Sequence, residues 1–395
     1  MTPFGFHTSA SLYIGRDAVA ALGDRIRSQV RADRVLIVTD ANLVAAGLVE
    51  RVLAPLKAAG IATSIFDGCT PEPPSTIVLA AVEAAKGFSP SAVLGLGGGS
   101  NMDTAKLVAM LLAHGGTLDD YVGDSRVPGP VVPIVAVPTT AGTGSEVSPA
   151  AVYTDVAKAI KVSCLSPYLR PALAVVDAAL TDRCPTQVTA DSGIDALTHA
   201  VETFTAVSQA EFVTRSGGTT VYQGKNAIAD LFALEAIRLV GLHLDRAVHE
   251  PTNRDARNGM ALAATLGGLA FSNAGVALTH AMEYPVGGAV HVSHGAGNGL
   301  LLPHVMRFNA SVCASTIAQL GPSLDVSTDA DAVIARIEAL SAAVGIPRTL
   351  RDLGVTSAML PDFAEKAFAV KRLMRVNPRM PTAPAELLAV YEAAF

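Results

Sequence analysis

One stretch of the chain, between positions 191 and 295, concentrates side chains that could bind a metal ion: Asp195, His199, His280, His291 and His294. Asp195 and His199 are four residues apart, and residues at this spacing lie on one face of a helix. The pair can therefore bind one ion together, and histidines from later elements could complete the site. A carboxylate with imidazoles suits Fe(II), Zn(II) or Mn(II). Three or four such ligands leave room for a substrate oxygen.

A simpler interpretation exists, because an Asp-x-x-x-His pair is by itself usually an ordinary surface pair on a helix. Here the neighbours are apolar, among them Ala196, Leu197, Ala200 and Val201. A buried carboxylate or imidazole needs a partner, so several of them in apolar surroundings would be costly without an ion. Spacing alone does not decide which histidine of the later His-Val-Ser-His pair is the ligand.

Length and composition set the outer bounds. A chain of 395 residues predicts two domains. The net charge is −6 and no cluster of Lys and Arg occurs, which argues against nucleic acid or an anionic membrane as a partner. The four widely separated cysteines show no CxxC spacing and are typical of a reducing, cytoplasmic compartment. The first residues lack the basic and apolar regions of a secretion signal.

The segment from Asn258 to Met282 contains no Asp, Glu, Lys or Arg and superficially resembles a membrane span. It nevertheless carries polar residues such as Thr265, Asn273 and His280. We interpret it as two buried helices that are separated by a break near residues 272–275.

The elements that must position these residues fall into two halves. Up to about position 182, short apolar strands alternate with helices, which implies right-handed crossovers and a mostly parallel sheet. The expected strands cover 9–15, 35–39, 61–66, 92–96, 131–137 and 172–176, with a hairpin over 150–163. The fold class is thus a Rossmann-like α/β domain, 1–182, followed by an all-α metal-binding and substrate domain, 183–395. Within the second half, 207–225 is expected to be a polar loop.

A glycine-rich turn follows the apolar strand 92–96. Gly97, Gly98, Gly99 and Ser100 open the next helix, where glycines let a phosphate approach the backbone and the helix N-terminus attracts it. A plain glycine turn is the alternative. A second loop, Thr139–Ser145, follows another strand and can line the same edge of the sheet. Asp40 ends an apolar strand, where a carboxylate can bind a ribose diol and would favour NAD over NADP.

With these residues identified, the sequence resembles the iron-containing (group III) alcohol dehydrogenases of the dehydroquinate synthase-like superfamily. The resemblance covers nearly the whole chain. Five segments carry it: GGGSNMDTAK (97–106), PTTAGTGSEVSP (138–149), DALTHAVE (195–202), HAMEYPVGG (280–288) and HVSHGAGNGLLLPHVMRFN (291–309). The resemblance implies NAD and iron as cofactors, a homodimer, and an active site in a cleft between the two domains.

The resemblance also implies roles for individual residues. The implied metal ligands are Asp195, His199, His280 and His294. The implied cofactor-binding residues are Asp40, Gly97, Gly98, Gly99, Ser100, Asp103, Lys106, Thr139, Thr140, Thr143, Lys161 and Leu180. One departure from the family pattern affects the proton relay: many members have a second histidine where this chain has Tyr284. His291 or Tyr284 is therefore the expected relay, and His291 is the better candidate because histidine is the side chain most suited to proton transfer near neutral pH.

The function predicted from these features is reversible hydride transfer between a small alcohol and NAD, aided by a metal. The alternatives are a hydroxyacid–oxoacid transhydrogenase, a maleylacetate-reductase-like reductase, a dehydroquinate-synthase-like lyase and a non-catalytic protein that binds NAD or metal. The presence of all four implied ligands argues against a metal-independent reductase. A lyase of the dehydroquinate synthase type needs a strongly cationic pocket, and the segment of the ligands contains few Lys and Arg residues.

Overall fold

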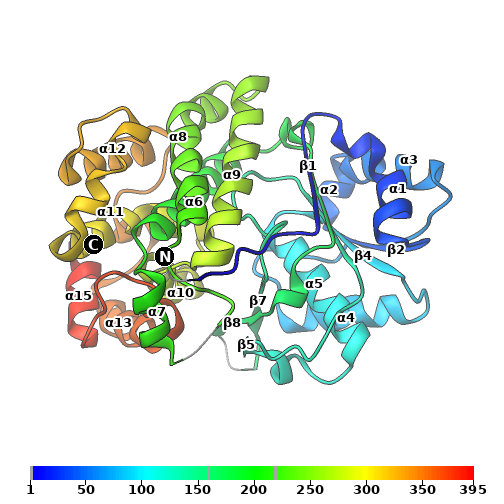
Figure 1. The fold of residues 1–395 in the computed structure, drawn as a ribbon, viewed down its shortest axis with the longest axis horizontal. Coiled ribbons are helices and arrows are strands. Elements are labelled where there is room, and N and C mark those ends of the chain that lie inside the picture. Colours follow the sequence, from blue (N-terminus) through cyan, green and yellow to red (C-terminus); the bar gives the residue numbers. More distant parts are fainter. Residues whose placement is uncertain (1–2, 158–159, 218–219) are drawn as a thin grey trace. The chain divides into compact units, whose positions relative to one another are not determined.

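The computed structural model describes residues 3–157, 160–217 and 220–395 (Figure 1). The chain divides into two compact units. One comprises His7–Cys184, and the other comprises Pro185–Phe395 together with the first described residues of the chain. Each unit is described below by itself.

A six-stranded sheet forms the centre of the first unit. Its order is β1 (Ser11–Ile14), β9 (Leu173–Val176), β6 (Ile134–Pro138), β4 (Ala92–Gly97), β2 (Arg34–Val38) and β3 (Ala62–Phe66). Every pair of neighbouring strands in this sheet is parallel, as the alternation of strands and helices predicts. β4 and β6 are buried along their whole length, which explains their continuous apolar runs.

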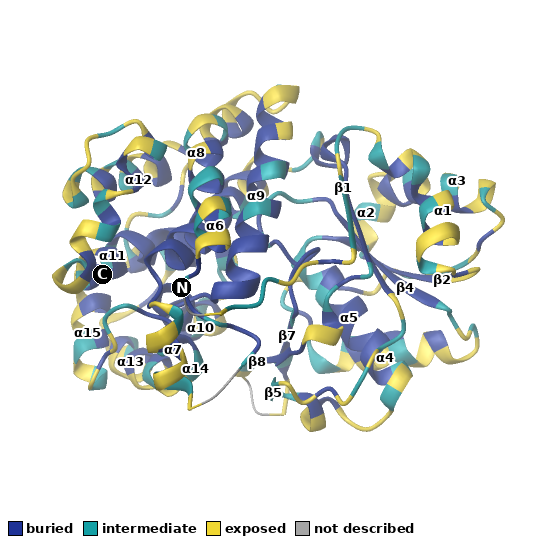
Figure 2. Cartoon of the chain, in the orientation of Figure 1, coloured by how far each residue is buried: buried dark blue, intermediate teal, exposed yellow. Residues whose placement is uncertain are grey.

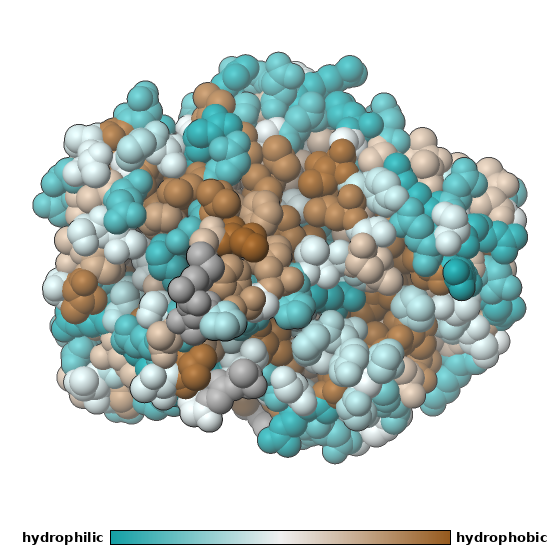
Figure 3. All heavy atoms as spheres, viewed as in Figure 1, coloured by the Kyte–Doolittle hydropathy of each residue, from teal (hydrophilic) through white to brown (hydrophobic). Residues whose placement is uncertain are grey.

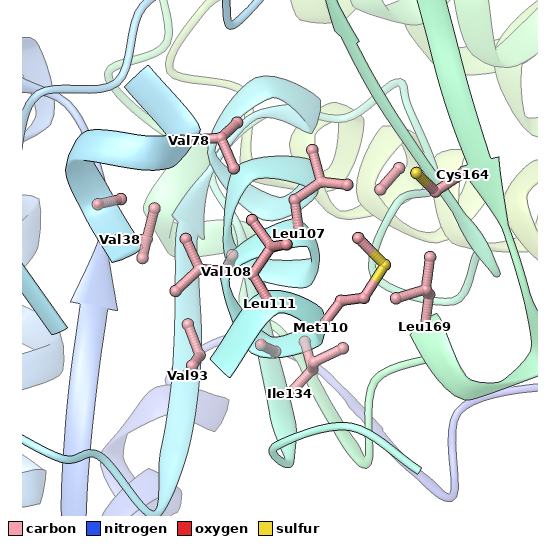
Figure 4. Close-up of a cluster of buried hydrophobic side chains, with 14 of the residues drawn as sticks. Val38, Val78, Val93, Leu107, Val108, Met110, Leu111, Ile134, Cys164 and Leu169 are labelled. Carbon is pink, nitrogen blue, oxygen red and sulfur yellow. The ribbon is translucent and has the colours of Figure 1, made fainter. Parts of the chain in front are cut away.

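Helices cover both faces of this sheet. Leu36 and Val38 of β2 contribute to a core with α4 (Ser75–Lys86) and α5 (Gly99–His114), drawn in Figure 4. Val35 and Ile37 of the same strand belong to a second core with α1 (Leu22–Arg25) and α3 (Leu48–Ala58). Successive strand residues point to opposite faces, so one strand supplies two cores.

The local structure differs from the sequence prediction in places. Between the first two expected strands, where one helix would continue the alternation, the chain forms a succession of a 3-10 turn (Ala18–Ala21), α1 and a π turn (Ile26–Val30). Between the next two strands it forms two helices, α2 (Ala41–Ala45) and α3, because Gly47 adopts φ 73° between them. The hairpin is formed by β7 (Ala150–Asp155) and β8 (Ile160–Leu165), with residues 158–159 outside the described part; β5 (Gly123–Asp124) completes this second sheet.

The second unit is helical. Its long helices are α6 (Thr186–Thr205), α8 (Ala227–His249), α9 (Arg254–Ala274), α10 (Leu278–Val290) and α11 (His294–Ala318). They are followed by α12 (Ala330–Ala343), α13 (Leu360–Ala369), α14 (Lys371–Met374) and α15 (Pro384–Ala393). The predicted loop 207–225 contains a further helix, α7 (Gln209–Ser216), which is capped by Ser208; residues 218–219 of that loop lie outside the described part.

Helix α6 lies at the centre of this unit, packed against α8, α9 and α11. Every residue of α6 from Gly193 to Thr205 is buried, and α9 is buried along most of its length (Figure 2). Apolar side chains also reach the surface (Figure 3), and Leu231 on α8 is 70% exposed.

The charge-free segment forms the end of α9 and the start of α10. Among the described residues, no single helix has the length and hydropathy of a membrane span. Only α9 and α10 taken together meet those criteria, by length and composition, and the two are bent by 107° at their junction.

Candidate metal centre and cofactor cradle

Helix α6 places Asp195 and His199 on the same face, as their spacing predicts. Oδ2 of Asp195 lies 4.0 Å from Nδ1 of His199, and both residues are buried. Their burial removes the surface-pair interpretation, because neither side chain reaches solvent freely.

Two later helices bring histidines to this carboxylate. His280 lies in the first turn of α10, with its Nε2 3.9 Å from Oδ1 of Asp195, and His294 is the first residue of α11. One potential ligand atom from each of Asp195, His280 and His294 lies within 4.8 Å of the other two. The imidazole centroids of His280 and His294 are 5.2 Å apart. Three segments that are far apart in sequence therefore converge on one point.

The fourth predicted ligand, His199, lies beside this group. Its ring stacks on Phe271 at 4.3 Å and on His280 at 4.9 Å between centroids. Burial lowers the pKa of His199 to about 4, and Asp195 only partly offsets the effect. His199 is therefore neutral at neutral pH, which is the form that binds a metal.

The polar atoms of this cluster are incompletely paired. Nδ1 of His199 and Nε2 of His280 are buried, and neither has a hydrogen-bond partner in the part of the chain that the structure describes. Buried polar atoms are normally paired, so such an exception needs an explanation. The donor set, one carboxylate and neighbouring imidazoles, fits a divalent ion.

Two buried glutamates accept hydrogen bonds from the far side of the histidine rings. Oε2 of Glu202 lies 2.6 Å from Nδ1 of His280, and Glu283 binds Nδ1 of His294. Asn298 donates to Oδ1 of Asp195 at 2.9 Å and contacts Nε2 of His294. The sequence interpretation missed these three residues.

A signal for the two glutamates was present in the sequence. Glu202 follows His199 by three positions, and Glu283 follows His280 by three positions, so each shares a helix face with a predicted ligand. Each glutamate, however, contacts a histidine of a later segment. Spacing identifies the buried face, whereas the pairing depends on the tertiary structure.

The two candidates for the proton relay differ in position. The Tyr284 ring lies on α10 with its centroid 6.2 Å from that of His294, and its hydroxyl accepts a hydrogen bond from Arg372 at 3.4 Å. His291 ends α10 in the left-handed conformation at φ 53° and is exposed. The structure thus brings Tyr284, rather than His291, next to a ring of the cluster.

The glycine-rich turn lies between β4 and α5 in the first unit. Gly97 has φ 143°, and a Cβ there would lie 2.0 Å from Nδ2 of Asn101, so only glycine fits. A Cβ on Gly99 would lie 3.0 Å from Cγ2 of Thr143, whereas a Cβ on Gly98 would be in ordinary contact with Thr140. The turn is therefore closely packed against α5 at Gly97 and against the second loop at Gly99.

The second loop is joined to the turn by its backbone. The N–H of Thr139 donates to the carbonyl of Gly97 at 3.0 Å. The predicted cofactor residues of the two loops, Gly97–Ser100 and Thr139, Thr140 and Thr143, thus lie side by side at the carboxyl edge of the parallel sheet, where open α/β sheets bind ligands.

Asp40 closes the same edge at the end of β2. Its Oδ1 caps α2 by accepting the N–H groups of Asn42 and Leu43, and its Oδ2 accepts from Asn101 at 2.7 Å. Asp40 is therefore a helix cap in the described chain, which is the ordinary role of such a residue. Its predicted contact with the ribose remains a prediction.

Asp103 and Lys106 occupy a different place from the rest of the predicted cofactor set. Lys106 is fully buried, and its ammonium donates to Oγ of Ser145 and to the carbonyls of Ser148 and Ala150. Asp103 accepts from the Ser145 hydroxyl at 2.6 Å. The two residues thus fasten the second loop to α5.

The remaining predicted cofactor residues lie elsewhere in the first unit. Lys161 on β8 forms an ion pair with Glu72. Leu180 is buried in a 3-10 turn (Ala178–Thr181). Neither makes a contact that reveals a cofactor role, so both assignments remain predictions.

A parallel sheet with a glycine-rich turn at its carboxyl edge, and a helical unit with a buried carboxylate–imidazole cluster, are features of a metal-dependent, dinucleotide-linked oxidoreductase. Comparison with known families narrows this class. Residues 9–178 match the model of the family described as iron-containing alcohol dehydrogenase, and residues 220–395 match that of its C-terminal region. The chain belongs to the iron-containing alcohol dehydrogenase family.

Curated relatives agree with this assignment. An NAD-dependent methanol dehydrogenase of Bacillus methanolicus is 35% identical over 93% of this chain and 94% of its own length. Long-chain-alcohol dehydrogenase 1 of Geobacillus thermodenitrificans is 36% identical over 97% of this chain and 94% of its own. A solved 1,3-propanediol oxidoreductase superposes with a TM-score of 0.92 at 34% identity, with all of both chains covered.

Proposed function

We propose that this protein interconverts a small alcohol and its aldehyde or ketone by NAD(H)-linked hydride transfer, with a divalent ion held by Asp195, His199, His280 and His294. The observation that carries the proposal is the convergence of ligand atoms from α6, α10 and α11. Among them, Nδ1 of His199 and Nε2 of His280 are buried and have no hydrogen-bond partner among the described residues. When bound, the ion supplies Lewis acidity for the oxygen of the substrate.

The chain's own residues prepare the site for this chemistry. Burial alone would raise the pKa of Asp195, but His199, His294 and His280 lower it, so the carboxylate stays ionised. Glu202 and Glu283 hold the rings of His280 and His294 through Nδ1, which leaves Nε2 of each ring toward Asp195 and Asn298. The ring of Phe271 stacks on His199 and forms an apolar wall on that side of the site.

The cofactor proposal is that NAD binds the turn Gly97–Ser100 and the loop of Thr139, Thr140 and Thr143. Support comes from Gly98 and Gly99, which are half-buried and carry no side chain, and from their place at the N-terminus of α5. Asp40 favours NAD because a carboxylate repels a 2′-phosphate. Two residues are candidates for the proton relay. His291 is proposed on the chemistry of its side chain, whereas the rival, Tyr284, is favoured by its position next to His294.

The test is a substrate screen on metal-defined enzyme. Protein purified without oxygen would be analysed for metal, stripped, and reloaded with Fe(II), Zn(II) or Mn(II). Each form would be offered NAD or NADP with methanol, 1,3-propanediol and a long-chain alcohol, because relatives with 34–36% identity are named for these substrates. NAD reduction that depends on the added metal is expected. Turnover that is independent of metal would contradict the proposal.

The same screen separates the enzyme from a transhydrogenase. An alcohol dehydrogenase releases NADH after each turnover, whereas a transhydrogenase retains its cofactor and needs a second carbonyl substrate. A burst of one NADH per site without further turnover, relieved by an added oxoacid, would favour the transhydrogenase.

We also propose a cytoplasmic homodimer. Support for the compartment is that none of the four cysteines is disulfide-bonded. Support for the dimer is the family resemblance, and exposed apolar residues on α8, led by Leu231, offer a surface to examine first. Sedimentation of the purified protein would test the dimer, and a monomer at micromolar concentration would exclude it.

A further inference from the structure

The start of helix α10 cannot satisfy its own backbone. The first N–H groups of any helix lack partners within the helix, and a side-chain oxygen at the N-cap normally supplies one. Here the N-cap is Ala277, which has no such oxygen. The preceding residues form the 107° corner between α9 and α10, where Gly275 adopts φ 109°. Ala277 and Thr279 are buried, so water cannot replace the cap.

The missing cap comes from another helix. Glu202, in the last turn of α6, accepts the N–H of Ala277 at 2.8 Å and the N–H of Thr279 at 2.6 Å. The negative carboxylate also lies at the positive end of the α10 dipole. Both oxygens of Glu202 thus accept a backbone N–H group, which is the role of an ionised carboxylate.

The same carboxylate determines the state of a predicted ligand. Oε2 of Glu202 lies 2.6 Å from Nδ1 of His280. An ionised carboxylate only accepts, so Nδ1 must carry the proton and Nε2 must present its lone pair. That Nε2 is the buried atom that faces Asp195 and has no partner among the described residues.

We propose that Glu202 is a positioning residue that couples metal binding to the order of the α9–α10 corner. One carboxylate holds both the tautomer of His280 and the first turn of α10, so fixing the ring through an ion also fixes the corner. Coupling of this kind is reciprocal. If the bound ion favours the ordered corner by some factor, then ordering the corner raises the affinity for the ion by the same factor. The proposal rests on the metal site of the proposed function.

Glu283 provides a matched comparison within the same site. It binds Nδ1 of His294 as Glu202 binds that of His280. Helix α11, however, has its own cap, because Ser293 accepts the N–H of Ala296. Glu283 can therefore orient a ring without being needed to cap the helix that carries it.

The experiment compares Glu202→Gln, Glu283→Gln and the exposed control Glu365→Gln. Zn(II) affinity would be measured on metal-free protein by competition with a chelator. The amide hydrogen exchange of residues 275–280 would be measured with and without Zn(II). Both site variants should lose about 10–100-fold in affinity. Only Glu202→Gln should lose the metal-dependent protection of the corner, and Glu365→Gln should behave as wild type.

A rescue separates the two roles of Glu202. Ala277→Ser in the Glu202→Gln background supplies an N-cap hydroxyl. It should restore protection of the corner, but this protection should no longer depend on Zn(II). The metal affinity should recover only in part, because ¹⁵N signals of His280 should still show a displaced tautomer. If Glu202→Gln proves unfolded, Glu202→Asp, which retains the charge on a shorter arm, should give an intermediate loss of both.

The outcomes distinguish this proposal from the proposed function. If Glu202→Gln bound Zn(II) as tightly as wild type, or if its corner exchanged as in wild type, the coupling would be wrong. The proposed metal-dependent function would not be affected by that result. Full restoration of the wild-type affinity by Ala277→Ser would show that Glu202 is only a cap. If wild-type protein itself bound no Zn(II), Fe(II) or Mn(II), the metal site of the proposed function would fail first.

Discussion

The cofactor cradle and the metal cluster are built in opposite ways. The cradle depends on atoms that are missing: at Gly97 a single added carbon would overlap the amide of Asn101. The cluster depends on polar atoms that are present but incompletely paired, such as Nε2 of His280. The cradle should therefore tolerate no added atom at Gly97, and the cluster no lost ligand atom. An added side-chain atom should therefore harm the cradle more than the cluster, and a lost ligand atom should harm the cluster more than the cradle.

The largest effect is expected at the cluster. His280→Ala removes one converging ligand, so metal affinity should fall by more than the roughly 10–100-fold typical of a residue that only orients a ligand. NAD-linked turnover should nearly vanish with it. Metal content after dialysis and circular dichroism would be measured together. Retention of a full equivalent of metal with a normal rate would show that His280 is not a ligand.

A smaller effect is expected at the edge of the cluster, where the relay candidates differ. General acid–base groups contribute about 10²–10⁴-fold to rate. Whichever of His291→Gln and Tyr284→Phe lowers kcat that much, while the metal is retained, identifies the relay. Tyr284 is adjacent to His294, so Tyr284→Phe tests the relay that the structure favours. His291 is exposed, and His291→Gln tests the relay that the sequence favours. Loss of metal from His291→Gln would mean that His291, not His294, is the ligand.

At the cradle, Gly97→Ala should weaken NAD binding by about tenfold or more and destabilise the fold by about 1–3 kcal/mol, because φ 143° strains any residue with a Cβ. Gly98→Ala is the matched control, since its Cβ would meet Thr140 only at ordinary contact distance. NAD titration and thermal unfolding check both variants, and metal content should not change in either. Equal behaviour of the two variants would contradict the steric account.

The smallest effect concerns the fastening of the second loop. Burial lowers the pKa of Lys106 from 10.5 to about 8, and Asp103 only partly offsets it. Between these pH values the unfolded chain binds a proton that the folded chain does not, so this lysine makes the free energy of unfolding rise with pH. Below pH 8 its destabilising contribution is fully present. Denaturant unfolding of wild type and Lys106→Met across this window should show the rise only in wild type.

The same contrast explains what the sequence could reveal. Continuous apolar runs such as Val35–Val38 predict buried parallel strands, and the structure confirms the α/β and helical architecture. The glycine turn was recognisable because its position between strand and helix is local. The convergence of α6, α10 and α11 was foreseeable only through the family motifs, since nothing local relates Asp195 to His294.

Other features could not be predicted because they depend on partners that are distant in sequence. Nothing in the sequence around Glu202 distinguishes it from the other residues of α6. Its role follows from the N-terminus of α10, where Ala277 has no side-chain cap. Lys106 looks like a cofactor ligand in a glycine-rich motif, yet its hydrogen bonds go to Ser145 and to the carbonyls of Ser148 and Ala150. Helix α7 was hidden because its short, polar sequence has the composition of a loop.

The charge-free stretch from Asn258 to Met282 has a consequence before the fold is complete. Charged residues normally act as gatekeepers against self-association, and here they stand only at the two ends, at Arg257 and Glu283, with none in between. In the native protein α9 and the start of α10 are buried, so the stretch is harmless there. In a newly made or denatured chain it is exposed, and intermolecular association competes with folding. Recovery from denaturant should therefore fall as protein concentration rises, and synthesis in cells should benefit from chaperones that shield this segment.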